Sequence, residues 1–475
     1  MTRLTAAEAY DRAQTLWGRG ADMTAYESAL WHLSDRQTLR SASVIVEILD
    51  RPPDWERLVN AHVWGLGRVP RLRQRVVADP LRLGPPAWTD TKVDLDYHLR
   101  RLVLGDGAGL SDVFAFASTM HEEAFARDRP LWLATLLEGL PGGQAAWILK
   151  LHHALADGEE VVALFELLHS RVRESTIGPA TLPPAPHEHR SRLGLAAHHA
   201  AQLLWRAPVT GARAARVGGD ALRDPRGSVM RTLHTAEAAG RSGSAVRLGP
   251  SPVLRARGTH RAFDAVVLTH DALRATADNS GALIGEVAAA ALIAGIGRYH
   301  AALGDPVSEL RISVPLNRRA EHHGQRLARA HITAPAGAMS LSERIIRLRA
   351  RLTAAEQRPT VDLVRLAAPA VSRMPNLVIG PIIEGAARPL ALRTFAIRGL
   401  NRDAYLAGAQ VSEMFSFAPT EGAAISATLL NHQNRVCLAF NYDTAAVTDV
   451  ETMRRSVRAA LTAALGTGSW TEAAS

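Results

Sequence analysis

The stretch from Trp147 to Val162, WILKLHHALADGEEVV, ends an apolar run with two adjacent histidines and adds an Asp-Gly pair shortly after them. A metal site, a general base and simple packing are the three uses such a pair has. Neighbouring side chains of a strand point to opposite faces, so His152 and His153 are poorly arranged to chelate one ion. The spacing also differs from the H-E-x-x-H zinc pattern. We therefore expect no metal site.

A general base is the functional alternative, because histidine titrates near neutral pH. If the strand ends at this pair, one ring packs inward and the other faces outward at the strand's C-terminal end, where α/β folds place functional groups. Asp157 and Gly158 would close the loop into the next helix. The glycine permits a tight turn, and the aspartate either caps the helix or holds the loop through an ion pair. A packed core pair with a capping aspartate is the structural alternative.

Two further histidine pairs act as internal controls. They lie at His198–His199 and His322–His323, and neither has an Asp-Gly pair at the same spacing after it. Histidine pairs are thus frequent in this chain. The specific feature is the seven-residue pattern His-His-x-x-x-Asp-Gly.

The rest of the chain predicts two α/β halves with a different segment between them. In the first half, residues 41–49 and a hairpin over 131–140 and 145–153 show strand patterns, while 52–69 and 158–172 show helical ones. A Pro-rich stretch over 178–190 follows, and then an arginine-flanked helix with Leu193, Ala197, Ala200 and Leu204 on one face. Strand and helix patterns resume near residue 257. We predict domains over residues 1–176 and 257–475, joined by a helical linker over 177–256.

Composition narrows the class of protein. The chain has 475 residues, 47% of them hydrophobic and 21% charged, which is enough for two cores. A single cysteine, no apolar leader and no run long enough to span a bilayer predict a cytoplasmic protein. The net charge of +9 suits nucleic acid, an anionic membrane or anionic substrates. Aromatic residues are only 5% and scattered, and no nucleic-acid-binding motif occurs, so we expect no nucleic-acid partner.

The pattern His152-His153-x-x-x-Asp157-Gly158 matches the signature of the CoA-dependent acyltransferase superfamily, which includes chloramphenicol acetyltransferase and peptide-synthetase condensation domains. The flanking sequence resembles the bacterial wax ester synthase/diacylglycerol acyltransferase family from about residue 22 to about residue 460. The segments that carry this resemblance are Gly67–Val77, Val93–Arg100, Asp128–Gly143, Leu149–Gly158, Leu310–Arg319 and Ala404–Pro419.

The resemblance implies an α/β fold of two chloramphenicol-acetyltransferase-like domains joined by a helical crossover, with an active-site tunnel at their interface. His153 would be the general base that deprotonates a hydroxyl acceptor, and acyl-CoA would be a substrate, so no separate cofactor is expected. His152, Asp157 and Gly158 would hold the loop, with Asp157 paired to Arg318 or Arg319. A long-chain alcohol or a diacylglycerol would be the acceptor. There is no G-x-S-x-G elbow of a serine esterase.

Lipid substrates favour a membrane or lipid-droplet surface as the partner of the arginine-rich linker helix. The alternative is a helix packed over the domains with a solvated basic face. Oligomeric state is not predicted by any pattern in the chain.

Three segments depart from the family pattern. The family's Asn-Asp pair early in the second half corresponds to Gly285-Glu286, and its Asn-Val-Pro-Gly-Pro segment falls on Ala396–Leu400, AIRGL, which keeps only Gly399. Near the N-terminus, Ser-x-x-Asp becomes Thr24-Ala25-Tyr26-Glu27, and we interpret Glu27 as either solvated or structural in an N-terminal helix. These changes keep two alternatives open: an esterifying enzyme with a non-lipid acceptor, and a non-catalytic lipid-binding protein of the same fold.

Overall fold

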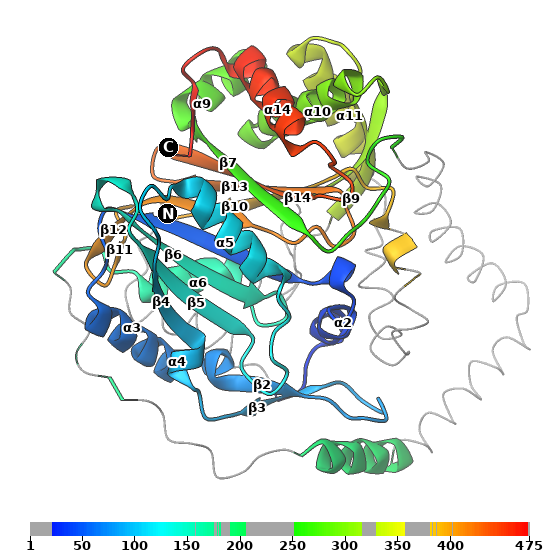
Figure 1. The fold of residues 1–475 in the computed structure, drawn as a ribbon. Helices are drawn as coiled ribbons and strands as arrows, with labels where there is room; N and C mark the ends of the chain where they lie inside the picture. Colours follow the sequence, from blue (N-terminus) through cyan, green and yellow to red (C-terminus); the bar gives the residue numbers. More distant parts are fainter. Residues whose placement is uncertain are drawn as a thin grey trace, which may run out of the picture.

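The computed structural model describes residues 21–156, 158–174, 178, 180–181, 191–205, 251–315, 329–356, 381, 383–385, 387–400 and 402–473. Two large β-sheets organise this part of the chain, one above the other in Figure 1. Helices cover the outer face of each sheet. The mixed α/β character predicted from the sequence is confirmed.

The first sheet contains the histidine pair. Its strand order is β11-β12-β1-β6-β5-β4, and β6 runs antiparallel to both neighbours. The strands are β1 (Ala42–Leu49), β4 (Leu99–Val103), β5 (Trp132–Glu138), β6 (Ala145–His152), β11 (Tyr405–Leu406) and β12 (Ala409–Phe417). Helices α3 (Trp55–Arg68) and α6 (Gly158–Leu168) pack on one face, with α4 (Leu95–His98) near the edge. A separate hairpin is formed by β2 (Gln74–Val77) and β3 (Ala87–Asp90).

Both faces of β1 are buried, which explains its almost unbroken apolar sequence. Ile45 and Leu49 contribute to the core beneath α3 and α6. Val44, Val46 and Ile48 point the other way, into a core shared with α5 (Leu110–Glu122) and the second sheet. In this shared core the rings of Phe263 and Phe417 stack with centroids 4.1 Å apart. Apolar packing therefore joins the two halves, and the sites between them have a fixed frame.

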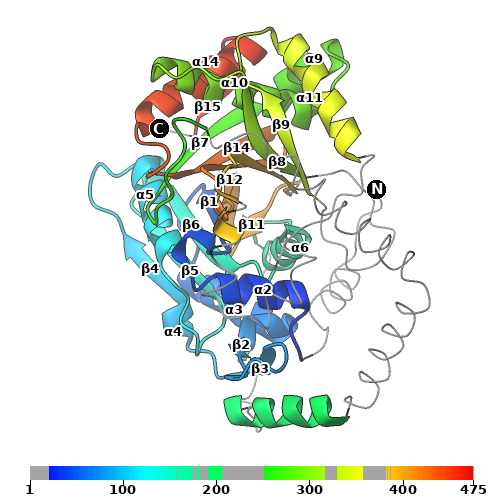
Figure 2. The same ribbon diagram turned by 90° about the vertical axis from the view of Figure 1, so that its right-hand side faces the viewer.

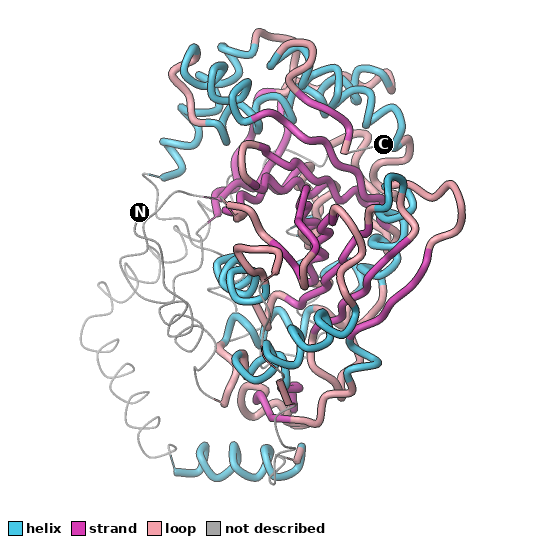
Figure 3. Tube along the Cα trace, turned by 90° about the vertical axis from the view of Figure 1, so that its left-hand side faces the viewer, coloured by secondary structure: helices cyan, strands magenta, loops and turns pink. Residues whose placement is uncertain are grey.

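The second sheet has the order β15-β7-β14-β13-β10-β8-β9. Its strands are β7 (Arg261–Thr269), β8 (Glu309–Pro315), β9 (Arg329–Pro335), β10 (Leu392–Arg398), β13 (Ile425–His432), β14 (Arg435–Asp443) and β15 (Trp470–Glu472). Helices α9 (His270–Asn279), α10 (Ile284–Ala302), α11 (Leu341–Glu356) and α14 (Val450–Leu465) cover its outer face (Figure 2). Figure 3 shows the same arrangement from the opposite side, with strands in the middle of the molecule.

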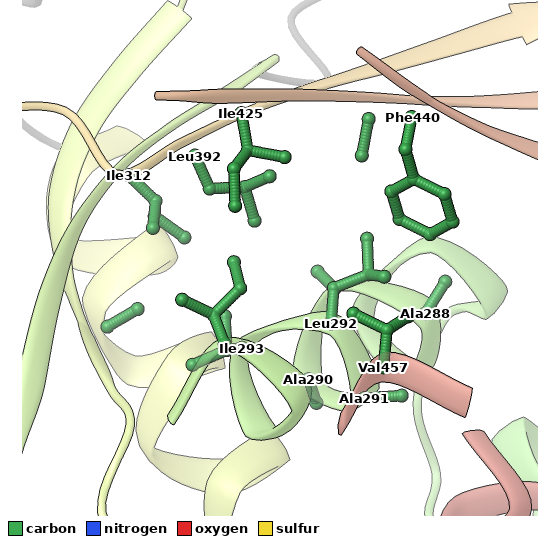
Figure 4. Packing of buried hydrophobic residues seen from close by; sticks show 14 of the residues in the cluster. Ala288, Ala290, Ala291, Leu292, Ile293, Ile312, Leu392, Ile425, Phe440 and Val457 are labelled. Atoms are coloured by element: carbon green, nitrogen blue, oxygen red, sulfur yellow. The ribbon is translucent and has the colours of Figure 1, made fainter. Parts of the chain in front are cut away.

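Helix α10 is apolar on nearly all sides because it lies inside this helical layer. Figure 4 shows Leu292 and Ile293 facing the sheet residues Ile312, Leu392 and Ile425. On another side α10 approaches the backbone just after β9. A Cβ at Gly297 would stand 2.1 Å from the Ala336 carbonyl oxygen there. The packing therefore requires glycine at this position.

Most local elements agree with the sequence predictions. The hairpin over 131–153 is present as β5 and β6, joined by a turn at Pro141–Gly143, and strand β1 and helices α3 and α6 follow the predicted segments. One pairing crosses the expected division: β11 and β12, from the second half, complete the first sheet. The boundaries 1–176, 177–256 and 257–475 stay a prediction, because most of the linker lies outside the described residues.

The described part of the linker is a helix over residues 192–205. It contacts the β2–β3 hairpin through Leu195, which packs with Val77 and Ala87. The apolar face predicted from Leu193 and Leu204 points to solvent and not toward the hairpin, and Leu204 is 76% exposed. Among the described helices, none is long and apolar enough to cross a bilayer alone, although α9 and α10 pass that test together as a pair bent by 94°.

Candidate active site

The histidine pair lies at the point where β6 ends and the chain turns toward α6. The His152 amide donates to the Leu131 carbonyl of the neighbouring segment at 3.1 Å, and the His153 amide donates to Ser41 O at 2.8 Å. Leu155 N then bonds back to His152 O at 2.8 Å and closes the turn. Backbone hydrogen bonds thus fix both residues, and their rings point to different partners, as the strand geometry predicts.

His152 is a buried scaffold residue in this arrangement. Its Nδ1 accepts the Ala154 amide at 3.0 Å, so the ring proton belongs to Nε2, which lies 2.8 Å from Ser34 Oγ. The Ser34 hydroxyl in turn donates to Leu30 O at 2.9 Å. Burial, followed by the nearby His153 and Lys150, lowers the pKa of His152 to about 3. The ring is therefore neutral with both nitrogens engaged, and neither is available for proton transfer.

His153 has a different environment. Its side chain is 20% exposed, its Nε2 lies 2.6 Å from Ser43 Oγ on β1, and its Nδ1 lies 3.7 Å from the Glu421 carboxylate. A histidine with one nitrogen facing a carboxylate and the other facing a hydroxyl has the arrangement of a general base. Sequence reasoning did not find Ser43 or Glu421. A serine in a strand and a glutamate in a loop sequence carry no local signal of this role.

The remaining predicted site residues are only partly described. Asp157 and its proposed partners Arg318 and Arg319 lie outside the described residues, so their roles stay predictions. Gly158 is the first residue of α6. The far end of α6 is tied to β1 by an ion pair between His169 and Glu47, with Nε2 and Oε2 2.8 Å apart. This ion pair fixes the helix that follows the histidine loop.

Two cavities lie near β1. One is small, about 10 Å³, and almost entirely apolar, and it is lined by residues of both halves: Ile45, Val161, Val162, Phe165, Ile397, Gly399, Leu400, Met414, Ser416 and Leu430. Ile45 follows Ser43 by two residues on the same face of β1, about 7 Å further along the strand. The second cavity, of about 140 Å³, is more polar and is lined by residues that include Ser34, Ser41, Arg40, Arg127 and His152. Of these two cavities, the second is the one that a residue of the histidine pair lines.

The segments that depart from the family pattern have structural explanations here. Thr24 and Glu27 form the capping box of α2 (Ala25–Leu33), so the structural alternative for Glu27 is confirmed. Glu286 accepts from the Leu283 amide at the start of α10 and pairs with Arg349 at 2.7 Å. A Cβ at Gly399 would stand 2.0 Å from the Asn431 carbonyl oxygen, which explains why this glycine is retained within AIRGL.

No group of three or more His, Cys, Asp or Glu side chains in the described part of the chain is arranged to hold a metal ion. The lone cysteine, Cys437, is buried in β14, and burial raises the pKa of its thiol to about 12. The thiol is thus protonated at neutral pH and is a poor nucleophile.

Comparison with known proteins gives the class first. The chain superposes on a wax ester synthase/diacylglycerol acyltransferase from Marinobacter aquaeolei with a TM-score of 0.64 at 16% identity, covering 94% of this chain and 98% of that one. It superposes on the first condensation domain of the CDA synthetase with a TM-score of 0.57 at 16% identity, covering 94% and 97%. These matches establish a two-domain, chloramphenicol-acetyltransferase-like fold.

The family follows from sequence. Residues 25–288 match the model of the wax ester synthase/diacylglycerol acyltransferase catalytic domain. A Mycobacterium tuberculosis protein named as a candidate diacylglycerol O-acyltransferase is 30% identical over 432 residues, which are 88% of this chain and 87% of the relative. A Mycobacterium bovis protein named in the same way is 45% identical over 98 residues, 20% of this chain and 19% of the relative. The chain belongs to the bacterial wax ester synthase/diacylglycerol acyltransferase family and is an acyltransferase of that type.

Proposed function

We propose that this acyltransferase moves a fatty acyl group from acyl-CoA to the hydroxyl of a long-chain alcohol or a diacylglycerol, with His153 as the general base. The observation that carries the proposal is the position of His153. It follows directly after strand β6, one of its ring nitrogens faces a hydroxyl at 2.6 Å, and the other faces the Glu421 carboxylate at 3.7 Å. Acyl-CoA enters as substrate, and the reaction needs no further cofactor.

The chemistry follows from this position. His153 takes the proton of the acceptor hydroxyl, and the resulting alkoxide attacks the thioester carbonyl carbon. The tetrahedral intermediate collapses with cleavage of the carbon–sulfur bond, and the CoA thiolate leaves and is protonated. A base of this kind contributes about 10²- to 10⁴-fold to the rate, and positioning of the two substrates supplies much of the rest.

Free-thiol release tests the proposal directly. The purified protein is incubated with palmitoyl-CoA and, separately, a fatty alcohol, a diacylglycerol or buffer. Acceptor-dependent release supports transfer and identifies the acceptor class. Release in buffer alone indicates a thioesterase, and no release with any acceptor contradicts the proposed function.

A serine hydroxyl 2.6 Å from a histidine nitrogen, as Ser43 is from His153, is also the geometry of an acyl-enzyme nucleophile. In direct transfer, Ser43 forms no covalent bond and lies only where the acceptor hydroxyl would approach His153. We therefore expect Ser43→Ala to keep kcat within about threefold of the wild type, since no bond to Ser43 is made. Mass spectrometry of protein that is incubated with palmitoyl-CoA and then quenched tests for the alternative, an acyl-enzyme on Ser43. An acylated Ser43 peptide, together with loss of activity in Ser43→Ala, would contradict direct transfer.

We also propose that the helix over residues 192–205 binds an anionic membrane or lipid-droplet surface. Its inner face is fixed by Leu195 and by His199, whose Nδ1 lies 3.0 Å from Asp79. Its outer face presents Leu193, Leu204 and Trp205, the last 86% exposed. Exposed leucine and tryptophan on a docked helix are typical of interfacial binding.

Replacement of Leu204 and Trp205 by glutamate is expected to weaken binding to anionic vesicles about tenfold or more, because both apolar side chains are lost and two negative charges are added. Vesicle flotation measures the change. Ile346→Glu, which alters an exposed apolar residue on α11, is the matched control and retains binding. If the wild type fails to float with anionic vesicles even at low salt, the helix is not a membrane-binding element.

A further inference from the structure

Glu421 lies in the short connection that leads from β12, in the first sheet, to β13, in the second. The Ala423 amide donates to Thr420 O at 3.0 Å, which closes a tight turn with Glu421 and Gly422 at its centre. Both central residues have positive φ, 44° for Glu421 and 86° for Gly422. Such turns favour Asn, Asp or Gly at the first central position, and glutamate there is uncommon. A side chain kept on a strained backbone suggests that its contacts matter.

The contacts of the Glu421 carboxylate come from three different elements. Ser41, just before β1, donates its hydroxyl to Oε1 at 2.8 Å, and Arg393 of β10 pairs with Oε2 at 2.6 Å. His153, at the end of β6, lies with Nδ1 3.7 Å from Oε1. Burial alone would raise the pKa of Glu421, but Arg393, His153 and Ser41 outweigh it and hold that pKa well below its usual range. The group is a fixed negative charge directed at one nitrogen of His153.

A carboxylate at Nδ1 determines which nitrogen of the imidazole carries the proton. A hydrogen on Nδ1 would point toward Glu421, and Nε2 would then offer its lone pair to Ser43 Oγ at 2.6 Å. His152 provides the contrast within the same turn: its Nδ1 accepts a backbone amide, so its Nε2 carries the proton. The two neighbouring rings would then hold opposite tautomers.

We propose that Glu421 is a positioning residue for His153: it orients the imidazole, selects the tautomer with Nε2 as the base, and stabilises the imidazolium formed when the acceptor is deprotonated. This inference rests on the proposed function for its kinetic part only. The carboxylate comes from the second half and the imidazole from the first. The base is therefore complete only when the two halves are joined.

The test compares Glu421→Gln, which keeps the shape and removes the charge, with Glu421→Asp, which keeps the charge on a shorter chain. Glu384→Gln is the matched control, because Glu384 also lies in the second half and pairs with Arg36 of the first at 2.9 Å. If Glu421→Gln does not fold, the Glu421→Gln/Arg393→Gln double variant, which lacks the whole ion pair, is used in place of the single variant. Thermal unfolding confirms that each protein used is folded.

We expect Glu421→Gln to lower kcat about 10- to 100-fold with little change in KM, because the lost interaction forms fully only in the transition state. Glu421→Asp should restore part of the rate, and Glu384→Gln should stay within about twofold. The other charged groups facing this region, unchanged in the single variants, are Arg393, Arg257, Lys150 and Arg127.

Histidine-ring NMR gives a readout that does not depend on activity. The His153 signals are assigned by their absence in a His153 variant. The ring proton should lie on Nδ1 in the wild type and in Glu384→Gln, and this preference should be lost in Glu421→Gln. The same tautomer in Glu421→Gln as in the wild type, together with a kcat within threefold of the wild type, would overturn the role of Glu421. If the wild type transfers no acyl group at all, the proposed function fails, while the NMR result still decides whether Glu421 acts on His153.

Discussion

His153→Ala should lower kcat for acyl transfer by about 10²- to 10⁴-fold, the usual contribution of a general base, while leaving the protein folded. The expected selectivity follows from the burial of the two rings. His153 is partly exposed beside Ser43 and Glu421, so its removal takes away the proton acceptor without opening a large core cavity. The hydrogen bond from the His153 backbone amide to Ser41 O does not involve the side chain, so the substitution keeps it. Initial rates with palmitoyl-CoA and the acceptor found by thiol release measure the effect.

His270→Ala is the control for this experiment, because His270 begins α9 on the outer layer of the second half, away from the pair (Figure 1). We expect it to keep wild-type turnover. A His153→Ala protein with near wild-type kcat would contradict the base assignment. Unfolding of His153→Ala, seen as a lower Tm, would instead assign the residue to packing.

Much of the site's first half follows from local sequence. Alternating and apolar runs predict β5, the turn at Pro141–Gly143 and β6, and strand geometry predicts that the rings of His152 and His153 diverge. The capping role of Glu27 was equally local, because the Thr24 and Glu27 side chains act within one helical turn. These predictions succeeded because each depends on residues a few positions apart.

The second half of the site depends on pairings that no local pattern encodes. Glu421 meets His153 because β12 leaves its own half to pair with β1, with Val44 opposite Phe417. Nothing in the spacing of the turn at Thr420–Gly422 indicates which histidine its carboxylate faces. The prediction of which face of the linker helix packs against the protein was wrong for a related reason. The periodicity identified an apolar face, but the docking partner, the β2–β3 hairpin, contacts the other face through Leu195 and His199.

The second large effect concerns the buried ion pair that joins β1 to α6. Glu47 is a lone acid within the apolar strand β1, and His169 lies just after α6; both side chains are almost completely buried. His169 Nδ1 donates to Phe165 O at 2.9 Å and Nε2 donates to Glu47 Oε2 at 2.8 Å, so the ring carries both protons. Burial alone would lower the pKa of His169, but the Glu47 carboxylate and the Phe165 carbonyl outweigh it and raise that pKa.

Removal of one partner should therefore be costly. We expect His169→Met to lower the free energy of unfolding by about 3–5 kcal/mol, because it leaves a buried carboxylate without its cation. The Glu47→Met/His169→Met double variant should recover most of this loss, since well-packed apolar side chains often replace a buried pair at little cost. Glu138→Gln is the control: its partner Arg101 is about half exposed, and the expected loss is about 0–1 kcal/mol. Urea denaturation measures all four proteins.

The pH dependence of the same experiment identifies the protonated ring. A group whose pKa is raised by folding stabilises the folded state fully below its unfolded pKa, about 6.5 for histidine, and loses that contribution as pH rises through the folded value. Measured against the double variant, which lacks both groups, the wild type should lose stability as the pH rises above about 6.5 and through the raised pKa of His169. A difference that stays constant over this range would mean that His169 is neutral in the folded protein. In that case the contact with Glu47 is an ordinary hydrogen bond, and the loss in His169→Met should fall to about 1–3 kcal/mol.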